Sequence, residues 1–180
     1  MRPCSGLCAA SLTCNAMEFV SEDIIDAVID ELGDLEDGHY GQLMEEFAEA
    51  QPVVFAWLFS EQFDLLTEDE KGYLQYLCLI AWRSITNVNG ELSEISEEHI
   101  GVAEEKNYEL MEASTGKKFR DRLTVFFENT DQEDLIAFAE DAVLEDEDDQ
   151  EALVTKEGRE MVFVAVATLV DACSAVSSAG

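Results

Sequence analysis

The chain has 180 residues, of which 47% are hydrophobic, so it is long and apolar enough to bury the core of one domain. Its 41 Asp and Glu against 10 Lys and Arg give a formal net charge of −31. Such a charge repels nucleic-acid phosphates and anionic membranes, so we expect neither as a partner. It attracts a basic protein, a polycation or a metal ion.

The N-terminal segment differs from the rest, because its first sixteen residues hold three of the five Cys and no Asp or Glu. Polar residues interrupt its apolar stretch, unlike that of a secretory signal. We expect residues 1–16 to be disordered or to precede a natural start at Met17, and residues 17–180 to form one α-helical domain. Cys78 and Cys173 lie in apolar helical patterns, which predicts buried free thiols and a cytoplasmic protein.

Directly after the N-terminal segment, apolar residues recur at helical spacing. Residues 21–33 place one apolar face on a helix with Ser21 as its N-cap and Gly33 as its stop. That face consists of Ile25, Val28, Ile29 and Leu32. Residues 39–50 repeat the spacing, and Pro52 then opens a helix that is apolar nearly all round, so we expect that helix to be buried.

The middle of the chain carries two capping signals. Thr67 and Glu70 predict a capping box ahead of a long helix, and Ser96 predicts the start of another that runs to about Ser114. Between them, Asn87 to Glu98 resembles an EF-hand calcium loop at several positions. With Gly90 at the sixth position of such a loop, however, Ile85 takes the first position and Ser96 the twelfth, and neither supplies a carboxylate. We therefore expect a turn and a helix cap there instead.

The last third continues the helical pattern. Residues 117–127 predict a helix with one aromatic side, and Thr130 with Glu133 predicts a capping box ahead of the next helix. Residues 144–151 are too polar to bury and predict a loop. Residues 162–170 are rich in β-branched side chains and could form a strand, but no partner strand is apparent, so we expect a buried central helix. The whole predicts an all-α, single compact bundle of roughly six to eight helices.

Acidic residues on the predicted helices and in the polar loop form a candidate interaction surface. Its residues are Asp23, Asp26, Asp30, Glu45, Glu46, Glu49, Glu145, Asp146, Glu147, Asp148 and Asp149. We interpret the chain as a non-enzymatic interaction or regulatory protein that binds a basic protein, in the manner of an inhibitor, an immunity-type protein or a phosphate-backbone mimic. A salt-adapted helical domain with no specific partner is one alternative.

An enzyme is the other alternative. Glu31 and Asp34 are spaced i, i+3, and Glu45, Glu46 and Glu49 form E-E-x-x-E on the next predicted helix. These carboxylates resemble the magnesium sites of the all-α nucleoside-triphosphate pyrophosphatases of the MazG type. The resemblance implies a bound Mg²⁺ and nucleotide hydrolysis, but it covers only this short stretch, and the order of the two motifs is reversed. The favoured interpretation needs no cofactor.

The basic residues are concentrated in one place. Lys117, Lys118, Arg120 and Arg122 lie within six positions of one another. We expect them to pair with an acidic helix of the same molecule. A small-anion site or a docking contact is the functional alternative.

Overall fold

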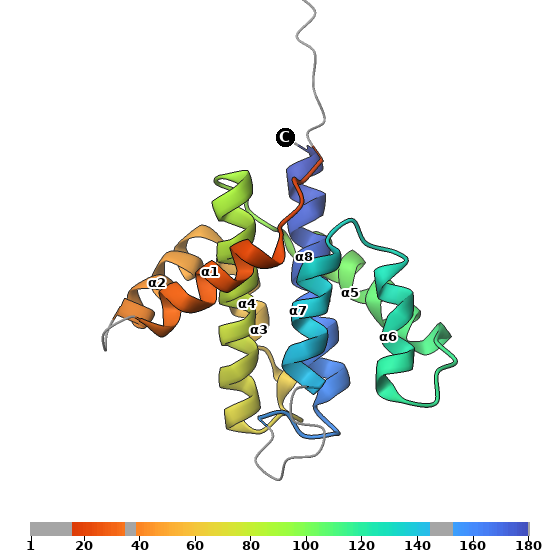
Figure 1. Cartoon of the computed structure of the whole chain (residues 1–180). Helices are drawn as coiled ribbons and strands as arrows, with labels where there is room; N and C mark the ends of the chain where they lie inside the picture. Colours follow the sequence, from red (N-terminus) through yellow and green to blue (C-terminus); the bar gives the residue numbers. More distant parts are fainter. Residues whose placement is uncertain (1–15, 35–38, 145–152, 180) are drawn as a thin grey trace, which may run out of the picture.

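The computed structural model describes residues 16–34, 39–144 and 153–179. In this part the chain forms eight α-helices and one short 3-10 helix, η1, with no strand (Figure 1). They are α1 (Glu22–Gly33), α2 (His39–Ala50), α3 (Pro52–Leu58), η1 (Glu61–Phe63), α4 (Glu68–Asn89), α5 (Glu97–Ala113), α6 (Phe119–Phe127), α7 (Glu133–Leu144) and α8 (Arg159–Ala179). The predicted all-α bundle of six to eight helices is confirmed.

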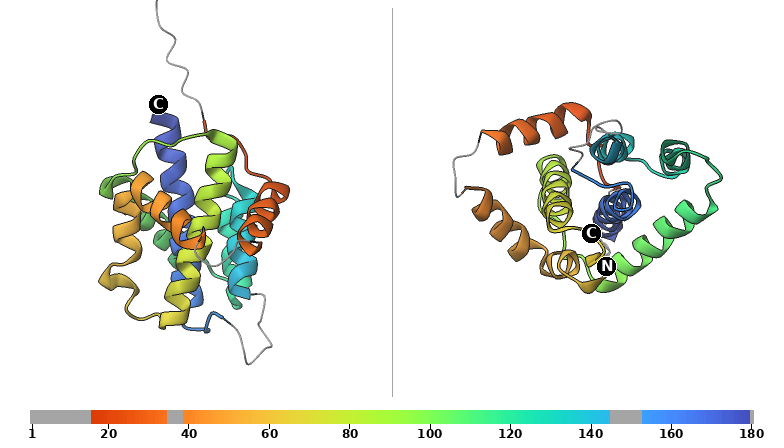
Figure 2. Two further views of the ribbon diagram at one scale, coloured as in Figure 1. Left: turned by 90° about the vertical axis from the view of Figure 1, so that its left-hand side faces the viewer. Right: turned by 90° about the horizontal axis from the view of Figure 1, so that it is seen from below.

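Two long helices, α4 and α8, stand side by side in the middle of the bundle, and the other helices surround them (Figure 2). Every residue from Val162 to Val170 is buried, because α4, α5 and α7 all pack against α8. Burial on all sides outweighs the modest cost of β-branched side chains in a helix. The predicted buried central helix is confirmed, and the strand is wrong.

α8 is also long and apolar enough to cross a membrane. The stretch Arg159–Ser177 has a mean hydropathy of 1.7. Core helices of globular proteins meet the same criterion, and 67% of the most apolar window is buried inside the fold. Length and composition therefore do not identify a membrane span here.

The thiols of the two central helices lie in the core. Cys78 of α4 and Cys173 of α8 are both buried and free, as predicted. Burial raises the pKa of Cys173 to about 12 and that of Cys78 further still. Both groups are therefore protonated at neutral pH, and thiols in this state are poor nucleophiles.

The surrounding helices pack on the centre through one face each. α1 buries Ile25, Val28 and Leu32, in agreement with the predicted apolar face. α2 buries Phe47, whose ring stacks on Trp82 of α4 with centroids 4.9 Å apart. These contacts hold α1 and α2 against α4.

The prediction that the helix opened by Pro52 is buried on all sides is wrong for α3. It has only seven residues and buries Val54 and Leu58 alone. Directly after it, Phe59 remains 59% exposed. So short a helix at the rim of the bundle contacts the core on one side only, and its apolar composition did not reveal this.

The two capping signals in the middle of the chain are confirmed. Thr67 Oγ1 accepts from the Glu70 backbone N–H, and the Glu70 carboxylate accepts from Thr67 N. Ser96 Oγ accepts from the His99 backbone N–H, and His99 Nδ1 accepts from Ser96 N. Each reciprocal pair satisfies backbone donors at a helix start, so α4 and α5 begin where the sequence predicted.

The other two capping signals are not used as predicted. Ser21 takes the N-cap position of α1 without a side-chain hydrogen bond, and Asp134 of α7 accepts from Glu22 N instead. Thr130 Oγ1 accepts from Gln132 N, two residues on, and α7 starts only after Gln132. At α1, a tertiary contact thus takes the place of the local cap.

The predicted turn at Asn87 begins later than expected. α4 continues through Asn87 and ends at Asn89. Gly90 follows it, with a φ of 78° that suits a residue without a side chain. The Asn89 side chain accepts from Glu18 N at 2.7 Å and donates to Ile85 O at 3.0 Å. The Asn89 side chain thus binds the segment before α1, and Asn89 itself belongs to the helix and not to a loop.

Candidate interaction groove

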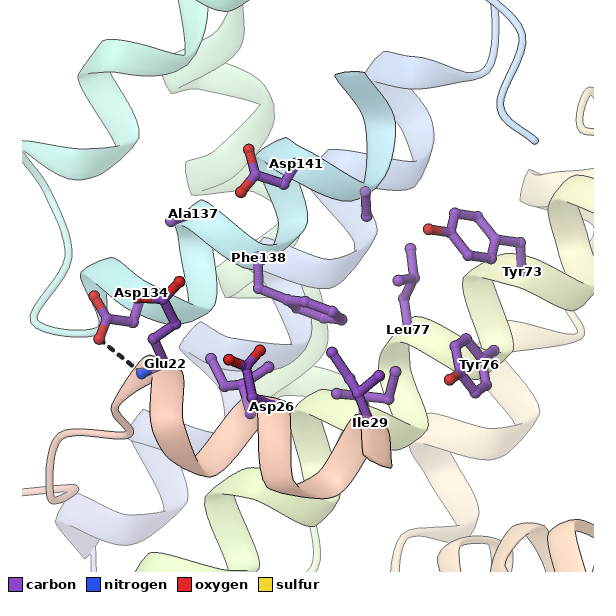
Figure 3. Close-up of a pocket in the computed structure, with 13 residues that line it drawn as sticks. Glu22, Asp26, Ile29, Tyr73, Tyr76, Leu77, Asp134, Ala137, Phe138 and Asp141 are labelled. Carbon is purple, nitrogen blue, oxygen red and sulfur yellow. Dashed lines mark hydrogen bonds between the residues drawn. The ribbon is translucent and has the colours of Figure 1, made fainter. Parts of the chain in front are cut away.

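A groove of about 430 Å³ opens between α1, α4 and α7 (Figure 3). Its side chains come from three segments far apart in the sequence: residues 22–29 of α1, 73–80 of α4 and 134–142 of α7. We call it the acidic groove. Its floor, its rim and its two ends differ in chemistry.

The floor of the acidic groove is apolar. It is made by Ile25 and Ile29, one turn apart on α1, by Leu77 and Ile80 of α4, and by Phe138 of α7. Ile25, Leu77 and Ile80 are buried in the core. Ile29 and Phe138 pack against that core but are only partly buried. Apolar surface is therefore left open inside the groove.

The rim of the acidic groove carries four carboxylates. Glu22 and Asp26 lie one turn apart on α1, and Asp134 and Asp141 lie two turns apart on α7. Asp26 and Asp141 stand on opposite walls, with the Phe138 ring between them (Figure 3). None of the ion pairs that join described residues involves these four groups. The rim is therefore a local concentration of negative charge.

One end of the acidic groove is held by hydrogen bonds between distant segments. Asp134 Oδ2 accepts from Glu22 N at 2.9 Å, at the N-terminus of α1. The Gln132 side chain accepts from Val20 N at 3.0 Å and donates to Glu18 O at 3.2 Å. A carboxylate at a helix N-terminus is also favoured by the helix dipole. These bonds fix the distance between the α1 and α7 walls.

The other end of the acidic groove is aromatic. The rings of Tyr73 and Tyr76 of α4 stack with centroids 6.4 Å apart. Beside the groove, the ring centroid of Tyr40 of α2 lies 6.3 Å from that of Tyr76. Burial raises the pKa of Tyr76, and burial together with Tyr76 raises the pKa of Tyr40. These two phenols stay neutral at physiological pH. Electron-rich rings of this kind attract cations.

The predicted interaction residues are only partly in this groove. The six that the structure describes are all exposed: Asp23, Asp26, Asp30, Glu45, Glu46 and Glu49. Of these, Asp26 alone lines the acidic groove. The other five predicted residues, Glu145, Asp146, Glu147, Asp148 and Asp149, lie outside the described residues.

The candidate magnesium ligands do not meet as one group. Glu31 forms an ion pair with Arg83 of α4 at 3.4 Å, and Asp34 follows the end of α1. Glu45, Glu46 and Glu49 are exposed on α2. In residues 16–34, 39–144 and 153–179, no three His, Cys, Asp or Glu form a group that could hold a metal ion. Magnesium binding stays a prediction.

Of the four basic residues between Lys117 and Arg122, two form ion pairs with acidic residues of the same molecule, as expected. Arg120 Nε pairs with Glu140 Oε1 of α7 at 2.9 Å, and Arg122 Nη1 pairs with Glu160 Oε2 of α8 at 2.9 Å. The two pairs fasten α6 to its neighbours. Lys117 lines a cavity of about 530 Å³ beside Arg122, where an anion site stays a prediction.

Sequence reasoning missed most of the acidic groove, although one signal was present. Asp134, Phe138 and Asp141 are spaced i, i+4 and i+7, so they share one face of α7. An acidic pair bracketing an aromatic residue on one helical face is unsuited to full burial. The partners of this face on α1 and α4 could not be found from spacing alone.

Comparisons of the chain with protein-family models, curated proteins and solved structures found no significant match.

Proposed function

We propose that this protein is a non-enzymatic interaction or regulatory protein that binds a basic protein through the acidic groove. One observation carries the proposal. Carboxylates without Lys, Arg or His partners among the described residues, Asp26 and Asp141 above all, flank a partly open apolar floor. Charge and apolar surface are thus combined at one place.

The two kinds of surface have different roles in binding. The formal net charge of −31 attracts a basic partner over distance and speeds the encounter. Once the partner is in contact, burial of Phe138 and Ile29 contributes free energy in proportion to the apolar area removed from water. An acidic surface without such a floor would give fast but weak binding.

The test compares two double variants that change the net charge equally. Asp26→Asn with Asp141→Asn alters the groove, whereas Glu105→Gln with Glu109→Gln alters exposed residues of α5 outside it. Binding of a fluorescently labelled Lys-rich peptide is measured at low salt. Since close ion pairs at a surface contribute up to about 1 kcal/mol each, we expect the groove variant to bind about tenfold more weakly.

Two outcomes would contradict the proposal. In the first, both double variants weaken binding equally, which would mean that the charge acts without a site. In the second, affinity is unchanged when the salt concentration rises to about 1 M, where charges are screened beyond about 3 Å.

A further inference from the structure

Two side chains in the floor of the acidic groove keep apolar surface that the described part of the chain leaves uncovered. Ile29 of α1 and Phe138 of α7 are only partly buried, and together they form an apolar strip (Figure 3). Carboxylates stand on both sides of the strip, Asp26 on one wall and Asp141 on the other. An occupant that matches this arrangement has an apolar stripe with cationic groups on both flanks.

The shape of the site favours a helix as the occupant. The walls and the floor are helices, and side-chain ridges of a further helix fit into such a groove. The described residues contain no strand, so they offer no sheet edge to which an extended peptide could add. A volume of about 430 Å³ lies at the small end of the about 300–1,000 Å³ that ligand pockets span. It therefore admits side chains rather than a whole helix.

Charge argues against a second copy of the chain. Another copy also has a formal net charge of −31 and presents the same acidic rim. Like charges facing each other across an interface are unfavourable. A partner of opposite charge is the one that the rim complements.

We infer that one amphipathic basic helix of the partner protein lies along the acidic groove and inserts side chains into it. Apolar side chains spaced i, i+3 or i, i+4 pack on Ile29 and Phe138. Lys or Arg side chains on the two flanks meet Asp26 and Asp141. This inference rests on the proposed function. It adds that the affinity depends on the spacing of apolar residues in the partner as well as on the partner's charge.

The test uses two peptides of about 18 residues, five helical turns, with the same Leu, Lys and Ala composition. In the amphipathic peptide the Leu residues lie on one helical face, and in the scrambled peptide they are spread around the helix. The amphipathic peptide should bind the full chain at least tenfold more tightly, and circular dichroism should show that it becomes helical on binding. Equal charge on the two peptides removes the electrostatic explanation.

A steric variant locates the binding site without removing core side chains. Ala137 lines the groove on α7, and Ala137→Gln places a longer neutral side chain there. Ala27→Gln is the matched control, since Ala27 is exposed on α1 and does not line the groove. The groove variant should reduce the preference for the amphipathic peptide to less than threefold, while the control should keep it.

The outcomes separate the inference from the proposed function. If both peptides bind wild-type protein equally and Asp26→Asn with Asp141→Asn weakens both, the inference is wrong and the proposed function stands. If neither peptide binds better than a Glu-rich control peptide, both are wrong. If Ala137→Gln leaves the preference intact, the peptide binds elsewhere and the inference is overturned. Displacement of the amphipathic peptide by spermine at an equal concentration would identify a small cation as the occupant and would also overturn it.

Discussion

A single buried carboxylate joins two distant parts of this protein. Glu70 is only 2% exposed, and its Oε1 accepts from Thr155 N at 2.8 Å and from Thr155 Oγ1 at 2.6 Å. Its Oε2 accepts from Thr67 N at 2.8 Å. A Cβ on Gly158 would overlap Glu70 Oε1, so the turn before α8 approaches this carboxylate as closely as glycine allows. Glu70 therefore links the start of α4 to the start of α8.

Glu70→Ala should lower the free energy of unfolding by about 3 kcal/mol, because it removes a helix cap and the charged acceptor of three hydrogen bonds from Thr67 and Thr155. Urea denaturation measures the change. Asp69→Ala is the control, since Asp69 is exposed on the same turn, and its effect should be below about 1 kcal/mol. Equal effects of the two substitutions would show that the link contributes nothing.

The same carboxylate predicts a pH dependence. Burial raises the pKa of Glu70, but hydrogen bonds from Thr155 and Thr67 outweigh burial and hold the pKa below its usual value. Glu70 therefore stabilises the fold above the pKa of the unfolded chain, and that stability is lost as the pH falls through the folded-state pKa. Acidification from about pH 5 to about pH 3 should thus destabilise wild-type protein more than Glu70→Gln. Parallel losses would contradict this assignment.

At the scale of the helices, the position of α1 is decided by two neighbours. α4 receives its apolar face, and Asp134 of α7 accepts from the backbone of Glu22 at its start. Ser21, the local residue suited to this task, makes no side-chain cap bond. The wall of the acidic groove thus depends on a bond between α7 and α1.

Asp134→Ala should destabilise the protein by about 1 kcal/mol, the usual cost of a lost N-cap acceptor. Asp134→Asn keeps an acceptor oxygen and should recover most of that loss, although it removes the charge. Thermal unfolding followed by circular dichroism measures both variants, with Glu133→Ala, an exposed neighbour, as the control. Identical melting temperatures for Asp134→Ala and Asp134→Asn would mean that the hydrogen bond does not matter.

At the scale of the whole molecule, the surplus of acids opposes compaction. The net charge is −31, and several of the cations are already engaged, as in the Arg83–Glu31 and Lys106–Asp171 pairs. The remaining carboxylates repel one another across a surface that the fold brings together. Stability should therefore depend on ionic strength.

Raising NaCl from low millimolar to about 1 M should raise the melting temperature by about 5 °C, because a gain of about 1–2 kcal/mol shifts a chain of this size by that amount. Differential scanning calorimetry measures the shift. A chain that loses its helical dichroism altogether when salt is removed would support the salt-adapted alternative. A melting temperature that is independent of salt would contradict the role given to self-repulsion.

Features set by residues close in sequence were predicted well. The capping box at Thr67, the N-cap at Ser96 and the apolar face of α1 need only neighbours within one or two turns. The burial of residues 162–170 followed from composition, because no exposed helix could carry so many apolar side chains. The limited burial of α3 was missed, since it depends on what lies beside that helix.

The all-α fold, the positions of the main helices and the strongly negative charge could be predicted from the amino-acid sequence, because apolar periodicity, caps and charge are local or additive properties. Which carboxylates line the same groove depends instead on how the helices pack. Asp26 and Asp141 belong to helices separated by most of the chain, and they face each other because α1 and α7 pack on the same side of α4. The position of these two carboxylates opposite each other depends on how the apolar faces of the helices pack, and it cannot be predicted from short-range sequence patterns.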